Sequence, residues 1–481
     1  MEERKGFGSN FGFLMAAIGS AVGLGNIWGF PNKMGANGGF TFLILYLVLA
    51  VFCGVIVMIG ELALGRKTGH GAIGAYRILS KKFKWLGWMG VLSAFLILGF
   101  YCALGGYCLK YVTLNVGNLF HAGFGTGTLD GAGVFDALMA NQGECVIYGL
   151  IFVAITMVIV MGGVGGGIEK VCSVGMPALF VMLVICIIRS CTLDGAVEGL
   201  KYMFVPGWAL ANGVIKEAPN FFSVVSTAGG QMFFSLSLGM AAMITYGSYL
   251  DKKENLQKNA IIIVVMDTLV ALMAGLCVIP GRFALDPTGN LGGPSLLFVT
   301  MQNVFDRMGG AGPVFGILFY LLVVFAAVSS SISLLEAVVA HYVDRARDRG
   351  KGDKRKPYSM LAGIAAGILC VIVCLDSLGS AGISPADILG MRGTMEKLPT
   401  WSADWLDFFD CIAEGILMPL GALLMSIMYG WEIGPEVVHA EATREGQSFG
   451  AYGWFKLCIK YITPLCMLLV LYGQIKEFFF V

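Results

Sequence analysis

The sequence is poor in charge. Asp, Glu, Lys and Arg make up 13% of its 481 residues, whereas soluble domains carry about 25%. So few charged side chains cannot cover the surface of a water-soluble or disordered chain of this length, which excludes a soluble enzyme. The net charge of +1 provides no field for a polyanion, so we expect no nucleic-acid partner.

Signatures of enzymatic, metal and disulfide chemistry are missing as well. The sequence holds four His, with no HExxH and no GxSxG motif, so we expect no enzyme. Its 13 Cys include no CxxC pair and lie mostly in apolar runs, where Cys acts as a small apolar side chain. We therefore expect no disulfide framework and no metal site built on Cys.

Long apolar runs fill most of the chain. Hydrophobic residues make up 57% of it, and a membrane-spanning helix needs about 20 residues that are mostly apolar. We predict an all-α integral membrane protein, with a single transmembrane domain over 1–481 and eleven transmembrane helices. The predicted spans are 11–33, 39–64, 87–116, 145–162, 168–190, 218–249, 258–283, 311–342, 359–376, 408–430 and 451–474.

Basic residues lie on one side of this topology. The loops that follow the second and eighth spans hold six and seven Lys or Arg, whereas 117–144 holds none. Because cytoplasmic loops are enriched in Lys and Arg, we predict a plasma-membrane protein with a cytoplasmic N-terminus and an external C-terminus. The alternative explanation for these Lys and Arg residues is that they contact anionic lipid.

Two of the predicted spans contain segments that disfavour a helix. GSAVGLGN, residues 19–26, is rich in Gly, and SLSLGM, residues 235–240, is polar and contains Gly. These spans begin two five-helix inverted repeats, 11–190 and 218–430, which leave 451–474 outside. Broken helices at matching positions of two repeats are typical of secondary transporters and mark their binding sites. Close helix packing through small residues is the alternative.

Polar side chains inside the apolar spans add to this pattern. Asp267 is an ionisable residue within a predicted span, where such residues are rare and mostly functional; a structural ion pair is the alternative. The run FAAVSSSIS places three hydroxyls in one helical turn. Hard cations prefer oxygen ligands, although such hydroxyls also bond back to their own helix. Asn26, Gln231, Ser235 and Ser237 are further polar residues within spans.

Four motifs resemble those of the neurotransmitter:sodium symporter family. They are GSAVGLGNIWGFP, GELALGR, QMFFSLSLGMAAMITYGSYL and FAAVSSSISLLE. The similarity covers nearly the whole chain and is strongest to bacterial amino-acid transporters of the leucine and multi-hydrophobic types. This family is one of the examples on which the rule about broken helices in inverted repeats is based. The resemblance and the paired broken helices are therefore not two independent indications of a transporter.

The resemblance implies a function and its partners. We expect sodium-coupled import of an L-amino acid by alternating access, with the amino acid and the lipid bilayer as partners. A non-transporting amino-acid sensor and a channel of related architecture are the alternatives. The oligomeric state stays open.

Two sodium sites follow from the resemblance. The residues implied for the first site are Ala21 through its carbonyl, Asn26, Ser235 and Asp267, with the substrate carboxylate completing the shell. The residues implied for the second site are Gly19, Val22 and Ala326 through their carbonyls, and Ser329 and Ser330 through their hydroxyls.

The substrate site implied by the resemblance lies at the two breaks. Its residues are Ala21, Gly23, Leu24, Gly25, Tyr101, Phe234, Ser235, Ser237, Met240, Ser330 and Leu334. Monoamine members have Asp at the position of Gly23, in place of the carboxylate that their substrates lack. Gly23 therefore favours a substrate that brings its own carboxylate. Met240 is an adaptable side chain, which favours a broad hydrophobic or aromatic pocket.

The same comparison bears on chloride. Chloride-dependent members bind the anion near the positions of Tyr46, Gln231, Ser235, Asp267 and Ala271, and have Asn at 267 and Ser at 271. Here Asp267 supplies a fixed negative charge and Ala271 supplies no hydroxyl. We predict that transport does not require chloride.

Two gates are implied at the ends of the substrate path. The residues that match the family's cytoplasmic gate are Arg4, Ser248, Tyr249 and Asp344. The external gate departs from the pattern, because Gly29 stands where the family has a basic residue and Lys33 lies one turn later. We expect Lys33 to pair with Asp407 or Asp410.

Overall fold

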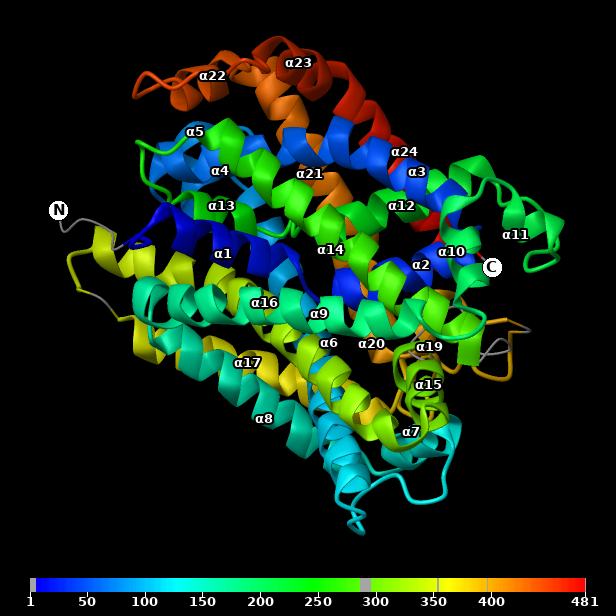
Figure 1. The fold of residues 1–481 in the computed structure, drawn as a ribbon. Coiled ribbons are helices and arrows are strands. Elements are labelled where there is room, and N and C mark those ends of the chain that lie inside the picture. The colour runs from blue at the N-terminus through cyan, green and yellow to red at the C-terminus, as the bar shows by residue number, and fades with distance from the viewer. Residues whose placement is uncertain (1–5, 286–295, 353, 396, 481) are drawn as a thin grey trace.

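The protein is a bundle of long helices. The computed structural model describes residues 6–285, 296–352, 354–395 and 397–480. The long helices lie side by side, and the start of the first helix and the end of the last lie at opposite ends of the bundle (Figure 1). This arrangement agrees with the all-helical membrane fold predicted from the apolar runs.

Nine helices in the described ranges are long and apolar enough to cross a membrane. Several of them contain short π- or 3₁₀-helical turns, labelled η. The nine candidate spans are α3, η2 and α4 (Phe40–Thr68), α6 (Leu86–Leu119), α8 (Gln142–Met161), η3 and α9 (Val164–Cys191), α14 (Leu256–Leu285), η5 and α16 (Gly309–Asp348), α17 (Arg355–Asp376), α20, η6, α21 and η7 (Trp405–Glu432), and α23, η8 and α24 (Tyr452–Phe479).

Shorter helices connect or cap these spans. They are α5 (Ala72–Leu79), α7 (Gly131–Ala140), α10 (Ala196–Phe204), α11 (Trp208–Ala211), η4 (Leu296–Thr300), α15 (Met301–Arg307), α18 (Pro385–Ile388), α19 (Thr400–Ala403) and α22 (Glu436–Ala442). Helices α10, α11, α15 and α19 gather at the end of the bundle where α24 finishes, whereas α5 and α22 lie towards the other end (Figure 1).

The first predicted span is broken where the Gly-rich segment predicts it. Helix α1 (Asn10–Ala21) begins at Ser9, whose hydroxyl accepts a hydrogen bond from the Gly12 amide, and it ends before Val22, which is extended. The chain resumes as η1 (Gly25–Gly29) and α2 (Phe30–Ala36), bent by 46° from α1. Counting this bent pair as one span raises the number of candidate spans to ten.

The sixth predicted span is also broken. Helix α12 (Phe221–Ser235) stops at the polar segment and α13 (Ala242–Gly247) resumes after it. Ser237, Gly239 and Ala241, between the two helices, have φ of 54°, 76° and 66°, a region that L-residues enter at a cost. The two pieces have 15 and 6 residues, so neither reaches the length of a span alone.

The two broken helices lie at the centre of the bundle. Helix α1 packs against α9, α14 and α16, and η1 packs against both α14 and α12. Helix α16 also packs along α6. The breaks in α1–α2 and α12–α13 therefore face each other, enclosed by α6, α14 and α16.

Candidate functional site

A cavity lies where the two breaks meet. It holds about 250 Å³ of space between atoms, space open to solvent included, and nine of the eleven predicted substrate residues lie in its wall. Those nine are Ala21, Gly23, Gly25, Tyr101, Phe234, Ser237, Met240, Ser330 and Leu334. Leu24 and Ser235 do not line it, although both touch residues that do. Ser20 and Ile97 also line it; Ile97 could have been found because it lies one helical turn before Tyr101.

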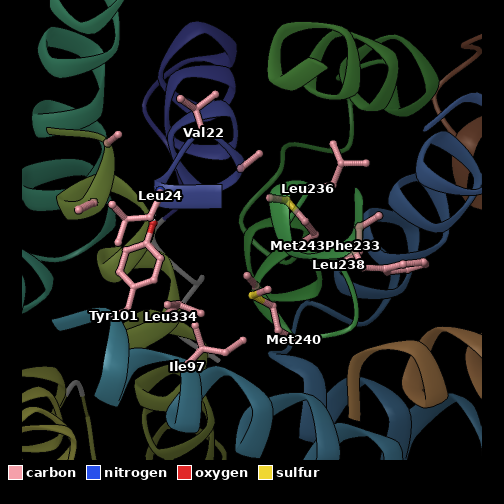
Figure 2. Close-up of a cluster of buried hydrophobic side chains, with 14 of the residues drawn as sticks. Val22, Leu24, Ile97, Tyr101, Phe233, Leu236, Leu238, Met240, Met243 and Leu334 are labelled. Atoms are coloured by element: carbon pink, nitrogen blue, oxygen red, sulfur yellow. Dashed lines mark hydrogen bonds between the residues drawn. The ribbon is translucent and has the colours of Figure 1, made fainter. Parts of the chain in front are cut away.

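Tyr101 connects α6 to the first break. Its hydroxyl accepts a hydrogen bond of 2.8 Å from the Leu24 amide. Figure 2 shows Tyr101 beside Leu24, with Leu334 and Ile97 close to its ring and Met240 on the other side of the cavity. The tyrosine therefore satisfies a backbone donor that the broken helix leaves without a helical partner.

Gly23 is required by the closeness of its neighbours. A Cβ at this position would lie less than 3.0 Å from the hydroxyl oxygens of Ser330 and Tyr101, a separation that real Cβ atoms do not show. A Cβ at Gly25 would lie 2.9 Å from the Phe234 ring. Glycine at these two positions leaves the main chain open to the cavity.

Asp267 on α14 is fully buried, and three donors converge on its carboxylate. The Asn26 amide donates to Oδ1 at 2.7 Å, the Ser235 hydroxyl contacts Oδ1 and Oδ2 at 3.0 and 2.9 Å, and the Tyr46 hydroxyl lies 3.3 Å from Oδ2. Asn26 also accepts a hydrogen bond of 3.0 Å from the Gly23 amide. One connected network therefore joins the predicted first sodium site to the wall of the cavity.

The hydroxyls of Ser329 and Ser330 face the end of α1. Ser329 Oγ lies 3.5 Å from the Val22 carbonyl oxygen and 3.0 Å from that of Ala326. Ser330 Oγ lies 3.3 Å from the Gly19 carbonyl oxygen and 3.4 Å from that of Val22. The five residues predicted for the second sodium site thus bring their oxygen atoms together, in the donor chemistry that a hard cation prefers.

A vestibule adjoins the central cavity at the end of the bundle that holds α19 and α20. Phe234 lines both spaces, so its ring separates them. Lys33 lines the vestibule and forms an ion pair of 2.5 Å with Glu414. The pairing that we expected, with Asp407 or Asp410, was therefore wrong, although both acids line the same vestibule. Glu414 lies one helical turn beyond Asp410, which is the signal that we missed.

A different network lies at the opposite end of the bundle. The Tyr249 hydroxyl donates to Glu336 at 2.5 Å, and Arg355 forms an ion pair with the same carboxylate at 2.5 Å. Glu336 is fully buried. An ionisable residue within a span is rare, so Glu336 could have been recognised in the motif that ends in SLLE.

The other predicted gate residues lie nearby. Asp344 accepts a hydrogen bond of 2.8 Å from the Gly71 amide, and Ser248 donates to the Thr245 carbonyl at 2.5 Å. Arg4 lies outside the described residues. Of the predicted gate residues, Tyr249 takes part in this network, and the Glu336–Arg355 ion pair is a contact that the sequence analysis missed.

Glu61 supports the second break. Its side chain is buried and accepts a hydrogen bond of 2.7 Å from the Gly239 amide. This contact ties the middle of the α3–α4 span to the segment between α12 and α13. The contact was missed, although an acid in the apolar motif GELALGR was its signal.

The chain is similar to known transporters along most of its length. Residues 4–119 and 138–479 match the model of the sodium:neurotransmitter symporter family. An uncharacterized sodium-dependent transporter of Bacillus subtilis, YhdH, is 34% identical over 473 residues, which cover 96% of each chain. An uncharacterized sodium-dependent transporter of Haemophilus influenzae is 30% identical over 488 residues, which cover 98% of each chain.

A solved structure shows the same fold. The crystal structure of MhsT in complex with L-phenylalanine matches with a TM-score of 0.83 and 34% identity, over 98% of this chain and all of that one. The fold and the sequence lead to the same assignment. The chain belongs to the sodium:neurotransmitter symporter family, a family of multi-pass membrane transporters and not of enzymes.

Proposed function

We propose that the protein is a sodium-coupled symporter that imports a hydrophobic or aromatic L-amino acid by alternating access. The observation that carries this proposal is the small cavity between the two broken helices, where the Tyr101 and Ser330 hydroxyls leave space only for glycine at position 23, so the chain has no acid there and the substrate must bring its own carboxylate. The L-phenylalanine held by MhsT supports the substrate class, and the sodium-dependent relatives support the coupling ion.

The architecture proposed with this function has eleven spans. Two inverted repeats, 11–190 and 218–430, each begin with a broken helix, and 451–474 adds the last span. The breaks in α1–α2 and α12–α13 support this division. The basic loops support a plasma-membrane orientation with the N-terminus in the cytoplasm and the C-terminus outside.

The first proposed sodium site combines the Ala21 carbonyl, Asn26, Ser235 and Asp267 with the carboxylate of the substrate. A buried carboxylate without a compensating cation is unfavourable in a membrane protein, and a bound sodium ion neutralises it. Ion and amino acid then bind as one unit, because each supplies charge that the other needs.

The second proposed sodium site uses only uncharged oxygen atoms. The carbonyls of Gly19, Val22 and Ala326 and the hydroxyls of Ser329 and Ser330 supply them. Two sodium ions that enter down a tenfold gradient across −100 mV release about 7 kcal/mol, enough to accumulate the amino acid about 10⁵-fold. One ion would allow an accumulation of only a few hundredfold.

Asp267 and Ala271 support transport without chloride. The carboxylate already supplies the negative charge that an anion would bring, and Ala271 offers no hydroxyl to bind one. Replacement of chloride by gluconate should therefore leave uptake unchanged.

Alternating access requires that the two ends open in turn. At the vestibule, which we take as the outer end, Phe234 and the Lys33–Glu414 pair close the path. At the other end, Tyr249, Glu336 and Arg355 close it. The contacts at one end must therefore break while the contacts at the other end remain formed.

Uptake of labelled phenylalanine into proteoliposomes tests the proposal. We expect accumulation that needs an inward sodium gradient and stops when potassium replaces sodium on both sides. Binding without accumulation would identify a sensor, and flux that follows the gradient of the amino acid alone would identify a channel; either result would refute symport. A competition panel of the twenty amino acids then defines the preferred side chain.

A further inference from the structure

An open pocket lies away from the central cavity, at the end of the bundle where α1 begins. It is formed by α5, the start of α6 and the end of α16. Its volume is about 930 Å³, a figure that includes space open to solvent. The residues of its wall that matter here are Arg77, Lys84, Trp85, Trp88, Arg345 and Arg349. None of them belongs to the cavity, to the proposed sodium sites or to either gate.

The pocket has an excess of positive charge. Four of its residues are Lys or Arg, and its one acid, Asp348, lies 3.3 Å from the imidazole of His70. Across the described part of the chain, Arg77, Lys84, Arg345 and Arg349 have no ion-pair partner within 4.0 Å. Four cations around one hollow repel each other, so an anion bound among them is stabilised.

The other wall of the pocket is aromatic and continues as an apolar stripe. Trp85, Trp88 and Leu92 are 45%, 55% and 47% exposed, and their spacing of three and four residues places them on one face of α6. The Trp88 ring lies 5.1 Å from the His341 ring, in an edge-to-face contact that anchors it at the pocket. Trp is enriched at membrane–water interfaces, where one side of the ring is wet and the other apolar.

This combination distinguishes a lipid from a soluble anion. A free phosphate or nucleotide needs the cations but not an exposed apolar stripe beside them. An anionic phospholipid needs both, because its headgroup is charged and its acyl chains must stay in the hydrocarbon. Basic pockets between transmembrane helices bind lipid headgroups of this kind.

We propose that this pocket binds the phosphodiester headgroup of an anionic phospholipid, with the acyl chains lying along Trp88 and Leu92. Arg77 on α5 and Arg345 on α16 hold the phosphate from two different helices. Asp344, next to Arg345, already bonds to the Gly71 amide just before α5. The bound lipid therefore strengthens the contact between these elements beside the proposed inner gate. The inference does not depend on the transported substrate.

Quenching of Trp fluorescence tests the site in reconstituted bilayers of the full-length protein. The bilayers consist of phosphatidylcholine with the same mole fraction of dibrominated phosphatidylglycerol or dibrominated phosphatidylcholine. We expect stronger quenching by the brominated phosphatidylglycerol, and the double variant Trp85→Phe/Trp88→Phe should lose this difference. No difference between the two lipids in the wild-type protein would overturn the proposal.

Charge variants identify the residues that hold the headgroup. Arg77→Gln/Arg345→Gln should lower the preference for phosphatidylglycerol on the order of tenfold or more. Lys81→Gln/Lys82→Gln is the matched control, since it removes two exposed charges from the connection between α5 and α6, outside the pocket. An equal loss in the control, or an unchanged preference in the pocket variant, would overturn the proposal.

A second pair of charge variants and a competition experiment complete the test. If Arg77→Gln/Arg345→Gln fails to fold, Lys84→Gln/Arg349→Gln removes the other two charges and should lower the preference in the same direction. An unchanged preference in this second variant would count against the pocket. Inorganic phosphate added at millimolar concentration should not displace the lipid; displacement would identify a soluble anion as the occupant and overturn the proposal.

Discussion

Asp267→Asn replaces the buried carboxylate with an amide of nearly the same shape. Asn26, Ser235 and Tyr46 all direct polar groups to the carboxylate, at 2.7 to 3.3 Å. The variant removes the only formal charge in this network and leaves the surrounding backbone in place. We expect it to weaken sodium binding at the first proposed site and to create a need for an external anion.

The size of the effect follows from the geometry of Ser235. Its hydroxyl and the Asp267 carboxylate are both proposed sodium ligands and lie 2.9 Å apart, so a cation that touches Ser235 is at most roughly 5 Å from the charge, and this outer limit gives the smallest effect expected. At an effective dielectric constant of about 20, this separation corresponds to ~3 kcal/mol. The apparent sodium affinity should therefore fall on the order of 100-fold.

Sodium-dependent binding of labelled phenylalanine to the purified protein measures this change. Titrations in sodium chloride and in sodium gluconate should agree for the wild-type protein, whereas chloride should restore part of the lost affinity in Asp267→Asn. Asp306→Asn is the control, because Asp306 is an acid on α15 outside the spans and accepts from Gln302 at 2.9 Å. Wild-type binding that requires chloride, or unchanged sodium affinity in Asp267→Asn, would refute the reasoning.

The other predictions concern the cavity and the inner network. Tyr101→Phe removes the partner of a main-chain amide and should weaken phenylalanine binding about tenfold in a competition assay. Gly23→Ala places a methyl group against two hydroxyls and should abolish binding while the protein still elutes as a monodisperse peak in gel filtration. Arg355→Gln leaves Glu336 buried without its cation, and should speed amide hydrogen exchange in α1 and α13 while lowering uptake.

Each of these variants has a matched control within the chain. Tyr111→Phe removes a hydroxyl on the same helix that has no hydrogen-bond partner in the described residues. Gly123→Ala adds a methyl group where no described atom lies within 4 Å. Arg444→Gln removes the half-exposed member of a long ion pair of 3.8 Å, and its buried partner Glu441 keeps the ion pair of 2.9 Å with Arg66. All three should bind and transport like the wild-type protein. Equal losses in a control and its test variant would show that the effect is not specific to the site.

Local sequence patterns predicted the parts of the fold that depend on local chemistry. Apolar runs located the spans, and the Gly-rich and polar segments located both breaks, because a helix needs particular residues along a continuous stretch. The division of 218–249 into two short helices lowers the number of candidate spans in the described residues from eleven to ten, and the break between α1 and α2 lowers it to nine if the bent pair is not counted. The resemblance to the family, and not periodicity, supplied Tyr101 and most of the cavity wall.

Contacts between distant helices were the part that the sequence left undecided. The Lys33–Glu414 pair joins residues 381 positions apart, and the choice among Asp407, Asp410 and Glu414 depends on how far the α20–α21 span is rotated about its axis. The Glu61 contact with Gly239 depends on the same kind of rotation. No local pattern encodes such angles, since they follow from the packing of all the helices together.

Phe234 and Ser235 are consecutive residues at the end of α12, and their Cα atoms are therefore only about 3.8 Å apart. One forms the partition between the central cavity and the vestibule, and the other is a proposed sodium ligand. A rotation of the backbone that swings the partition must also move the ligand. By thermodynamic linkage, sodium must then favour a shut partition by the same factor by which a shut partition favours sodium. Such reciprocity would prevent transport of the amino acid without sodium. The single peptide bond between Phe234 and Ser235 would be the mechanical connection between the partition and the sodium site.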